Sequence, residues 1–161
     1  MDKYDALKLQ NQLCFPLYAC SREIIKNYKP FLDAIDLTYT QYIAMMVLWE
    51  HKTMNVKMMG EILYLDSGTL TPLLKKLESK GFVTRQRSAA DERNLVVTIT
   101  SAGEALKEKA ATVPAEIAKC SNLEPEEAVM LYRILYKMLG KKELYESYCR
   151  PNQSKKKCQN L

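Results

Sequence analysis

The sequence lacks a hydrophobic run long enough to cross a membrane. Its longest uncharged apolar stretch extends only from Ile43 to Trp49, whereas a membrane-spanning helix needs about 20 apolar residues. The first residues are charged and amphipathic, which is not the pattern of a secretory signal peptide. We therefore expect a cytoplasmic protein without a membrane partner.

The sequence also lacks the cysteine and histidine spacing of a metal site. It contains five cysteines and a single histidine, His51, and the cysteines do not recur at short metal-binding intervals. Without a secretory signal, such a pattern indicates reduced thiols rather than a disulfide framework or a zinc site. We expect no metal and no cofactor, and we place His51 on the surface at a helix end.

Net positive charge is scarce outside the C-terminal segment. The net charge is +5, but residues 141–161 contain six basic and two acidic side chains, which leaves +1 for the first 140 residues. The overall charge is therefore weak support for nucleic-acid binding. The local charge balance is more informative, because the segment from Lys75 to Arg93 contains six basic and three acidic residues.

With 161 residues, 47% of them hydrophobic, the chain can bury a core as one domain. Its central part, residues 53–100, has the clearest pattern. Four leucines recur at the i, i+3, i+4, i+7 spacing of a buried helical stripe: Leu70, Leu73, Leu74 and Leu77. Asp66 or Ser67 can cap this helix, and Gly81 can end it. A shorter helix over 56–63 and a tight connection at 64–66 complete a helix-turn-helix.

A hairpin is expected directly after these helices. Its strands are residues 83–87 and 95–99, where Leu95, Val97 and Ile99 alternate, and a polar tip lies between them. Helix, turn, helix and charged hairpin form the layout of a winged helix, a mainly α fold with a small β-hairpin wing. A small helical domain whose lysines are merely solvated is the alternative.

The face opposite the leucines carries the residues expected to contact DNA. Small hydroxyl side chains let a backbone approach base edges, and lysines reach phosphates. An arginine at the wing tip can enter a minor groove, with a nearby aspartate to orient it. The predicted DNA-contacting residues are Ser67, Gly68, Thr69, Thr71, Lys75, Lys76, Arg85, Arg87, Asp91 and Arg93.

Long helices are expected on both sides of this segment. The first covers residues 4–29 and is interrupted by Pro16, which should remove a helical hydrogen bond and push Phe15 out of helical geometry. Its expected inward stripe contains Leu9, Leu13, Leu17 and Ile24. A capping box at 38–41 should start the next helix.

Beyond the hairpin, a capping box at Ser101 should start a long helix that bends at Pro114. Pro125 should open the last helix, with Leu131, Leu135 and Met138 facing inward. One small domain cannot cover this much apolar helix surface, so we expect a homodimer. The predicted organisation is a single domain over residues 1–149, with dimerisation helices at 4–30 and 101–149, followed by a basic, disordered tail at 150–161.

The residues from Leu63 to Glu78, with Val83-Thr84-Arg85 and Asp91-Glu92-Arg93, closely resemble the MarR-type winged-helix repressors. Within that family they are similar to the organic-hydroperoxide-sensing, OhrR-like branch. The resemblance extends from about residue 8 to about residue 139 and includes Pro72, which helix propensity disfavours. It implies a homodimer that binds a pseudo-palindromic double-stranded DNA operator.

Cys14 lies in the sequence Leu-Cys-Phe-Pro-Leu-Tyr. On sequence alone, a cysteine in an apolar context is more often an inert buried residue than a reactive thiol. The resemblance implies that organic hydroperoxides oxidise Cys14 to a sulfenic acid. It also implies that Tyr18, Tyr28 and Tyr39 hydrogen-bond the sensor, two of them across the dimer.

A sulfenic acid condenses readily with an accessible thiol. The resemblance implies a resolving cysteine near the end of the fifth helix of the other subunit, where Cys120 lies, although Cys149, Cys158 or a cellular thiol are alternatives. Two other functions stay open: a repressor of the same fold relieved by a small phenolic ligand, and a thiol peroxidase in which Cys14 turns over.

Overall fold

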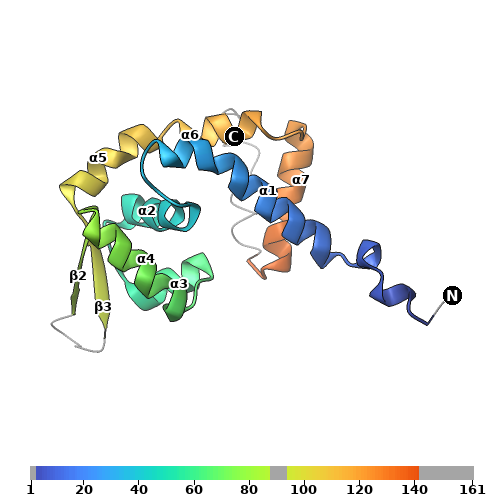
Figure 1. Ribbon diagram of the computed structural model, residues 1–161, viewed down its shortest axis with the longest axis horizontal. Coiled ribbons are helices and arrows are strands. Elements are labelled where there is room, and N and C mark those ends of the chain that lie inside the picture. Colours follow the sequence, from blue (N-terminus) through green and yellow to red (C-terminus); the bar gives the residue numbers. More distant parts are fainter. Residues whose placement is uncertain (1–2, 88–93, 142–161) are drawn as a thin grey trace. The chain divides into compact units, whose positions relative to one another are not determined.

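The computed structural model describes residues 3–87 and 94–141, which form two compact units, one ending at Ala111 and the other beginning at Thr112. The first unit contains α1 (Cys14–Asp33), α2 (Tyr39–His51), β1 (Thr53–Asn55), α3 (Val56–Leu63), α4 (Ser67–Ser79), β2 (Val83–Arg87), β3 (Leu95–Ile99) and α5 (Ser101–Ala110) (Figure 1). The second contains α6 (Val113–Lys119) and α7 (Pro125–Met138). The tail expected at 150–161 lies outside the described residues. Among the described helices, none is both long and apolar enough to cross a membrane.

Helix α2 lies at the centre of the first unit. Most of its side chains are buried, including Met45 and Leu48, which are fully enclosed. It begins with the predicted capping box, in which the Thr38 hydroxyl accepts the Gln41 N–H at 3.3 Å and the Gln41 carboxamide accepts the Thr38 N–H at 3.1 Å. It ends at His51, whose side chain is exposed as expected.

Helices α3 and α4 have the bounds and the buried leucines that the sequence predicts. Tyr64 adopts left-handed angles (φ 55°) in the connection between them. The C-terminus of α4 is closed by Gly81 at φ +76°, where the Phe82 N–H bonds the Leu77 carbonyl at 3.1 Å and the Gly81 N–H bonds the Glu78 carbonyl at 2.9 Å. This pair of bonds is the Schellman motif, which fixes the direction of the chain as it enters the wing.

The sheet has three antiparallel strands in the order β1-β3-β2. Both hairpin strands occupy their predicted ranges, and Val97 of the central strand is completely buried. Strand β1, which pairs Thr53 with Thr98, was not predicted from the sequence. A strand of three residues is too short to produce a readable alternation of apolar and polar side chains.

The expected first helix is wrong in its N-terminal part. Residues 5–7 and 9–11 form separate 3-10 turns, and α1 begins only at Cys14. Pro16 is the third residue of α1, where a backbone N–H has no helical acceptor, so the proline removes no helical bond. Phe15 is helical, contrary to expectation, and its N–H donates to the Gln12 carbonyl at 3.2 Å.

The capping box expected at Ser101 is wrong: a single side-chain cap forms one residue earlier, and Gly103 at the third helical position has no side chain to complete a box. Thr100 caps α5 instead, and its hydroxyl accepts the Gly103 N–H at 3.1 Å. The predicted long helix beyond it is two helices, because α5 ends at Ala110 and α6 begins at Val113 with Pro114 as its second residue. A proline is favoured in the first turn of a helix, where its missing N–H has no helical acceptor, and Pro114 occupies that position in α6.

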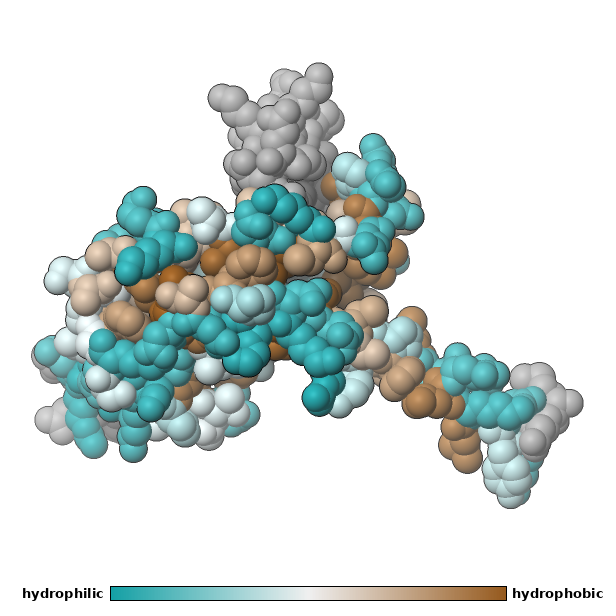
Figure 2. Space-filling model, turned by 45° about the horizontal axis from the view of Figure 1, so that its top comes forward, coloured by the Kyte–Doolittle hydropathy of each residue, from teal (hydrophilic) through white to brown (hydrophobic). Residues whose placement is uncertain are grey.

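The apolar stripes expected to face inward are largely exposed within one chain. In the segment that precedes α1 and in α1 itself, the exposed fractions are 58% for Leu9, 72% for Leu13 and 48% for Ile24. Apolar residues are visible along the surface of this N-terminal part of the chain (Figure 2). On α7, which starts at Pro125 as predicted, Leu131 and Met138 are also exposed. These helices therefore do not bury their apolar faces within their own unit.

Candidate nucleic-acid interface and redox site

Helix α4 separates a buried face from an exposed one. The four leucines are at most 8% exposed, whereas Ser67, Gly68, Thr69, Lys75 and Lys76 are exposed and Thr71 is half-buried. Residues 67, 71 and 75 follow the i, i+4 spacing of one helical stripe. The face predicted to contact DNA is thus a continuous surface of α4, with hydroxyl groups near its N-terminus and ammonium groups further along.

The N-terminus of α4 is held by Asp66. Its carboxylate accepts the Thr69 N–H at 2.9 Å and the Thr69 hydroxyl at 3.0 Å. These bonds, the backbone one first, lower the pKa of Asp66, so the cap stays ionised at neutral pH. A Cβ at Gly68 would lie 2.9 Å from the Asp66 carboxylate. Small side chains at 67–69 therefore leave the first turn open to a close-approaching ligand.

Arg85 joins the wing to α4, the second helix of the helix-turn-helix, which we call the reading helix. Its Nε and Nη2 donate to one Glu78 carboxylate oxygen at 3.0 and 2.6 Å, and its backbone N–H donates to the other at 3.0 Å. The side-chain bond from Arg85 is the main cause that lowers the pKa of Glu78. The Arg85 guanidinium is thus occupied inside the protein. Arg87 is exposed at the end of β2, and the predicted wing-tip residues Asp91 and Arg93 lie outside the described residues.

Cys14 is the first residue of α1 and its thiol is exposed. Tyr18, one turn further on, is 58% exposed, and its hydroxyl accepts a hydrogen bond from Arg22 at 3.0 Å. Cys20 on the same helix is exposed as well. The structure therefore leaves Cys14 open to solvent, with Tyr18 nearby but bonded to Arg22.

The other two predicted sensor tyrosines lie together at the corner between α1 and α2. The ring centroids of Tyr28 and Tyr39 are 4.9 Å apart, and Tyr42 stands 5.9 Å from Tyr28. Burial raises the pKa of all three phenols, to about 12 for Tyr42, and the neighbouring phenols add to the shift in Tyr28 and Tyr42. Each hydroxyl consequently keeps its proton at neutral pH and can donate a hydrogen bond.

Cys14 and Tyr28 are both on α1 but far apart. Fourteen residues of α-helix separate them, which is about 21 Å along the axis. A tyrosine hydroxyl cannot cross that distance, so Tyr28 does not contact Cys14 of its own chain. The structure thus brings Tyr28 and Tyr39 together and holds them away from the thiol of the same chain.

A groove of about 500 Å³ lies beside the tyrosine pair, between α1 and the start of α2. Apolar side chains of Ile25, Leu32 and Leu37 line it, together with Tyr39 and several charged side chains of α1. The lysines among these form ion pairs within α1, as in the 2.7 Å contact between Lys29 and Asp33. The groove can therefore accept a small, mostly apolar molecule.

Cys120 belongs to the second compact unit. It follows the last residue of α6, is exposed, and its sulfur lies 3.5 Å from the Glu116 carbonyl. Cys149 and Cys158 lie outside the described residues. The candidate resolving cysteine is therefore accessible to a reaction partner.

The sequence analysis missed part of the aromatic cluster. Neither Tyr42 nor Trp49 was among the residues predicted for the site. The two rings are 6.1 Å apart, and the Trp49 indole N–H donates to the Gly103 carbonyl at 2.9 Å. The helical spacing of residues 39, 42 and 49 is the signal that would have revealed an aromatic line running from the α1–α2 corner to α5.

Two helices joined by a tight turn and followed by the β2–β3 hairpin, to which the preceding strand β1 adds a third antiparallel strand, define a winged-helix protein. The model of the family described as "Transcriptional regulator SarA/Rot" matches residues 26–110. The chain belongs to this family of transcriptional regulators.

Individual relatives agree with the family assignment. An organic hydroperoxide resistance transcriptional regulator of Bacillus subtilis is 52% identical over 138 residues, covering 86% of this chain and 94% of the relative. The structure of reduced AbfR of Staphylococcus epidermidis bound to DNA is 35% identical, with a TM-score of 0.69, and the match covers 86% of this chain and 96% of AbfR. A disulfide-formed structure of AbfR is 34% identical, with a TM-score of 0.60, and covers 86% of this chain and 94% of AbfR.

A mutant MarR of E. coli in complex with operator DNA shares the fold, with 22% identity, a TM-score of 0.74 and coverage of 86% and 99%. The predicted MarR-type winged helix is thereby confirmed. The family and its relatives are transcriptional regulators, which agrees with the expected regulator rather than with the alternative of a thiol peroxidase.

Proposed function

We propose that the chain is a homodimeric, DNA-binding transcriptional repressor that releases its operator when an organic hydroperoxide oxidises Cys14. DNA binding is supported by the exposed hydroxyl and lysine face of α4, held in place by four buried leucines. Two such helices related by two-fold symmetry would read half-sites about 34–36 Å apart, so the operator is pseudo-palindromic.

Dimerisation is supported by the apolar surface that α1 and α7 leave exposed. Leu13 and Tyr18 on one helix and Met130 and Ile134 on the other are between 47% and 72% exposed. Burial of apolar surface stabilises association by about 25 cal/mol per Å² removed from water. A second copy of the chain is the partner that a regulator of palindromic DNA requires.

Redox sensing is supported by one observation in particular: an exposed thiol and a pair of protonated phenols that cannot meet within one chain. In a dimer, Cys14 of one subunit would receive hydrogen bonds from Tyr28 and Tyr39 of the partner subunit. Tyr18 would contribute from the helix turn next to the thiol. This arrangement needs both copies, so the sensor belongs to the dimer.

The proposed chemistry starts with attack of the Cys14 thiolate on the terminal peroxide oxygen. The S–O bond forms as the O–O bond breaks, the organic fragment leaves as an alcohol after taking up a proton, and the sulfur becomes a sulfenic acid. The Cys120 thiol of the partner subunit then attacks that sulfur and displaces water, which leaves a disulfide. The relative AbfR has a disulfide-formed structure, which supports a disulfide as the end product.

Release requires that oxidation favour a second arrangement of the dimer. Converting a population from 1% to 99% released takes about 5.5 kcal/mol of differential stability between the two arrangements. A sulfenic acid adds one polar group to a packed pocket, whereas a disulfide forces the two helices that carry it to approach. We therefore assign the larger part of the switch to the disulfide.

The test is DNA binding by fluorescence anisotropy before and after treatment with cumene hydroperoxide. Wild-type protein should lose affinity on oxidation, Cys14→Ser should bind and stay bound, and Cys20→Ser is the matched control because it removes another exposed thiol of α1. If Cys14→Ser is released as readily as wild type, another thiol is the sensor. On non-reducing gels, Cys120→Ser should abolish the linked dimer; persistence of the band in that variant assigns resolution to Cys149 or Cys158.

The groove beside Tyr39 favours a second candidate function, relief of repression by a bound phenolic acid. A ligand there would act without oxidation and without a thiol. Release of Cys14→Ser protein from DNA by a phenolic acid under reducing conditions would establish this function. No change in affinity at saturating ligand would eliminate it.

A further inference from the structure

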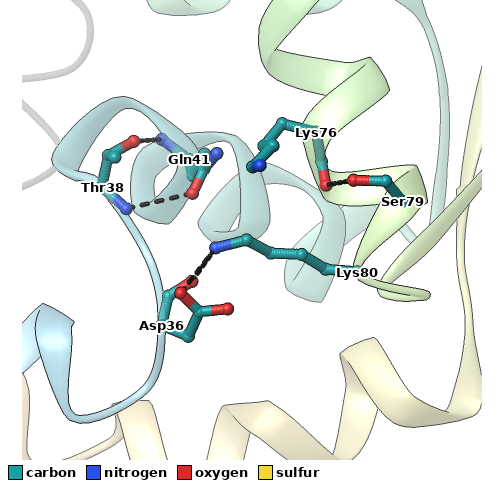
Figure 3. A network of polar contacts seen from close by, with 6 residues as sticks. All are labelled: Asp36, Thr38, Gln41, Lys76, Ser79 and Lys80. Atoms are coloured by element: carbon teal, nitrogen blue, oxygen red, sulfur yellow. Dashed lines mark hydrogen bonds and ion pairs between the residues drawn. The ribbon is translucent and has the colours of Figure 1, made fainter.

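Lys80 connects the end of the reading helix to the corner between α1 and α2. It follows the last residue of α4, and its ammonium group donates to the Asp36 backbone carbonyl and lies 2.9 Å from the Asp36 carboxylate (Figure 3). The Lys80 side chain is only 16% exposed. The Asp36 side chain is 79% exposed, but the contact joins residues 44 positions apart, unlike the ion pairs that link neighbouring turns of one helix.

The corner that Lys80 contacts is anchored in the core by the residues on either side of Asp36. Asp36 has a positive φ of 52°, a conformation that Asp and Asn adopt more readily than other non-glycine residues. Ile35 and Leu37 on either side of it are buried in the core. Thr38 then caps α2, and Tyr39 is the first residue of that helix. The backbone carbonyl that receives the Lys80 bond is therefore three residues from the tyrosine pair.

On its other side, Lys80 borders the turn that leads into the wing. Gly81 closes α4, and β2 begins at Val83. Leu77 in the last turn of the helix and Val83 in the strand are both fully buried. A displacement of Lys80 would therefore be passed to the reading helix and to the wing together.

We infer that Lys80 is a positioning residue, which sets the reading helix and the wing according to the state of the tyrosine corner. The inference deepens the proposed redox function and rests on it. When oxidation rearranges the packing around Tyr28 and Tyr39, the corner moves, and the Lys80–Asp36 contact transmits the movement to α4. The ammonium acts inside the protein and not on a phosphate.

The experiment measures the ratio of DNA affinities of reduced and oxidised protein in wild type, Lys80→Met and Lys80→Arg. Methionine keeps the apolar stem and loses the charge, whereas arginine keeps a donor for Asp36. Coupled sites typically change each other's affinity by about 5–150-fold. Lys80→Met should bring the ratio of reduced to oxidised affinity towards one, and Lys80→Arg should retain part of the wild-type ratio. A merely structural role would weaken both states equally and leave the ratio unchanged, which overturns the inference.

Two further variants separate the alternatives. Lys75→Met removes a charge from the exposed face of α4, so it should reduce the salt dependence of binding by about one counterion, whereas Lys80→Met should not. Asp36→Asn tolerates the left-handed backbone and weakens only the charged part of the contact, so it should give an intermediate ratio. A Lys80→Met protein with the reduced salt dependence of Lys75→Met would show that Lys80 contacts phosphate, and the inference would be wrong.

The failure of the proposed sensing would be recognised separately, because wild-type affinity would then not respond to hydroperoxide. Amide hydrogen exchange decides the inference in that case. Lys80→Met should speed exchange both at residues 35–39 and at residues 79–83, since the contact holds both segments. Unchanged protection in the 35–39 segment would refute the link whatever the redox result.

Discussion

Replacing Thr100 with alanine should destabilise the protein, because its hydroxyl makes two hydrogen bonds at the junction of β3 and α5. It accepts the Gly103 N–H at 3.1 Å as the cap of α5, and it donates to the Gly81 carbonyl at 2.6 Å. Loss of an N-cap costs about 0.5–2 kcal/mol, and loss of a second intramolecular bond costs about 0.5–1.5 kcal/mol. We expect Thr100→Ala to lower the free energy of unfolding by about 1–3 kcal/mol.

Urea denaturation followed by helical circular dichroism measures this change. The protein concentration must be the same for every variant, because the stability of a dimer depends on it, and an unchanged m-value shows that the midpoint shift reports stability. Ser101→Ala is the matched control: Ser101 is exposed and does not cap the helix, so its replacement should change stability by less than about 0.5 kcal/mol. Thr100→Ser keeps the hydroxyl and should retain most of the stability.

The reasoning would be refuted if Thr100→Ala did not lower the unfolding free energy more than Ser101→Ala. If Ser101→Ala costs as much as Thr100→Ala, the capping box expected from sequence is the one the protein uses. If neither has an effect, the hydroxyl bonds contribute no net stability at this junction.

Three further outcomes are expected. Because the pKa of Tyr42 rises from 10.0 to about 12 on folding, the folded state holds this proton more tightly. The resulting stabilisation is present below pH 10 and is lost as the pH rises towards 12; urea titrations in this range should show it, and Tyr42→Phe should remove it. Gly103→Ala should lower the unfolding free energy by about 1–3 kcal/mol through overpacking, since its Cβ would lie 2.2 Å from the Phe82 carbonyl oxygen; a stabilised variant in urea would contradict this. Lys75→Ala should reduce the slope of log affinity against log salt by about 0.9, whereas an unchanged slope would remove Lys75 from the interface; Lys109→Ala on α5 is the control.

The parts of the fold that sequence predicts are those with a long repeat and a matching cap. The leucine stripe of α4, the Thr38 capping box and the hairpin alternation each carry several concordant signals, and all three occur at their predicted positions. At Ser101 two neighbouring hydroxyl residues could both serve as the cap. The choice of Thr100 depends on the end of β3 and on the Gly81 carbonyl, which are set by tertiary structure.

The residues of the candidate redox site were proposed from the sequence without their geometry. Cys14 and the tyrosines were identified from the resemblance to the OhrR-like repressors, because a cysteine in this context alone is more often inert. Their arrangement was not, because it depends on where α1 begins and on how the α1–α2 corner folds. The Lys80 contact illustrates the limit, since nothing in the residues around Lys80 indicates a partner at Asp36. Such a pair becomes visible only when segments 44 residues apart are brought together.

The strand order β1-β3-β2 has a consequence for synthesis on the ribosome. The central strand is the last of the three in sequence, and Thr98 pairs with Thr53, which precedes it by 45 residues. At about 5–20 residues per second, β1 waits between about 2 and 9 seconds for its partner to be made. During that interval α3 and α4 can form local turns, but β1 has no strand to pair with and β2 has no neighbour. A nascent chain therefore acquires a complete wing only after Ile99 has left the exit tunnel, so premature termination before β3 should yield a product unable to compete for the operator.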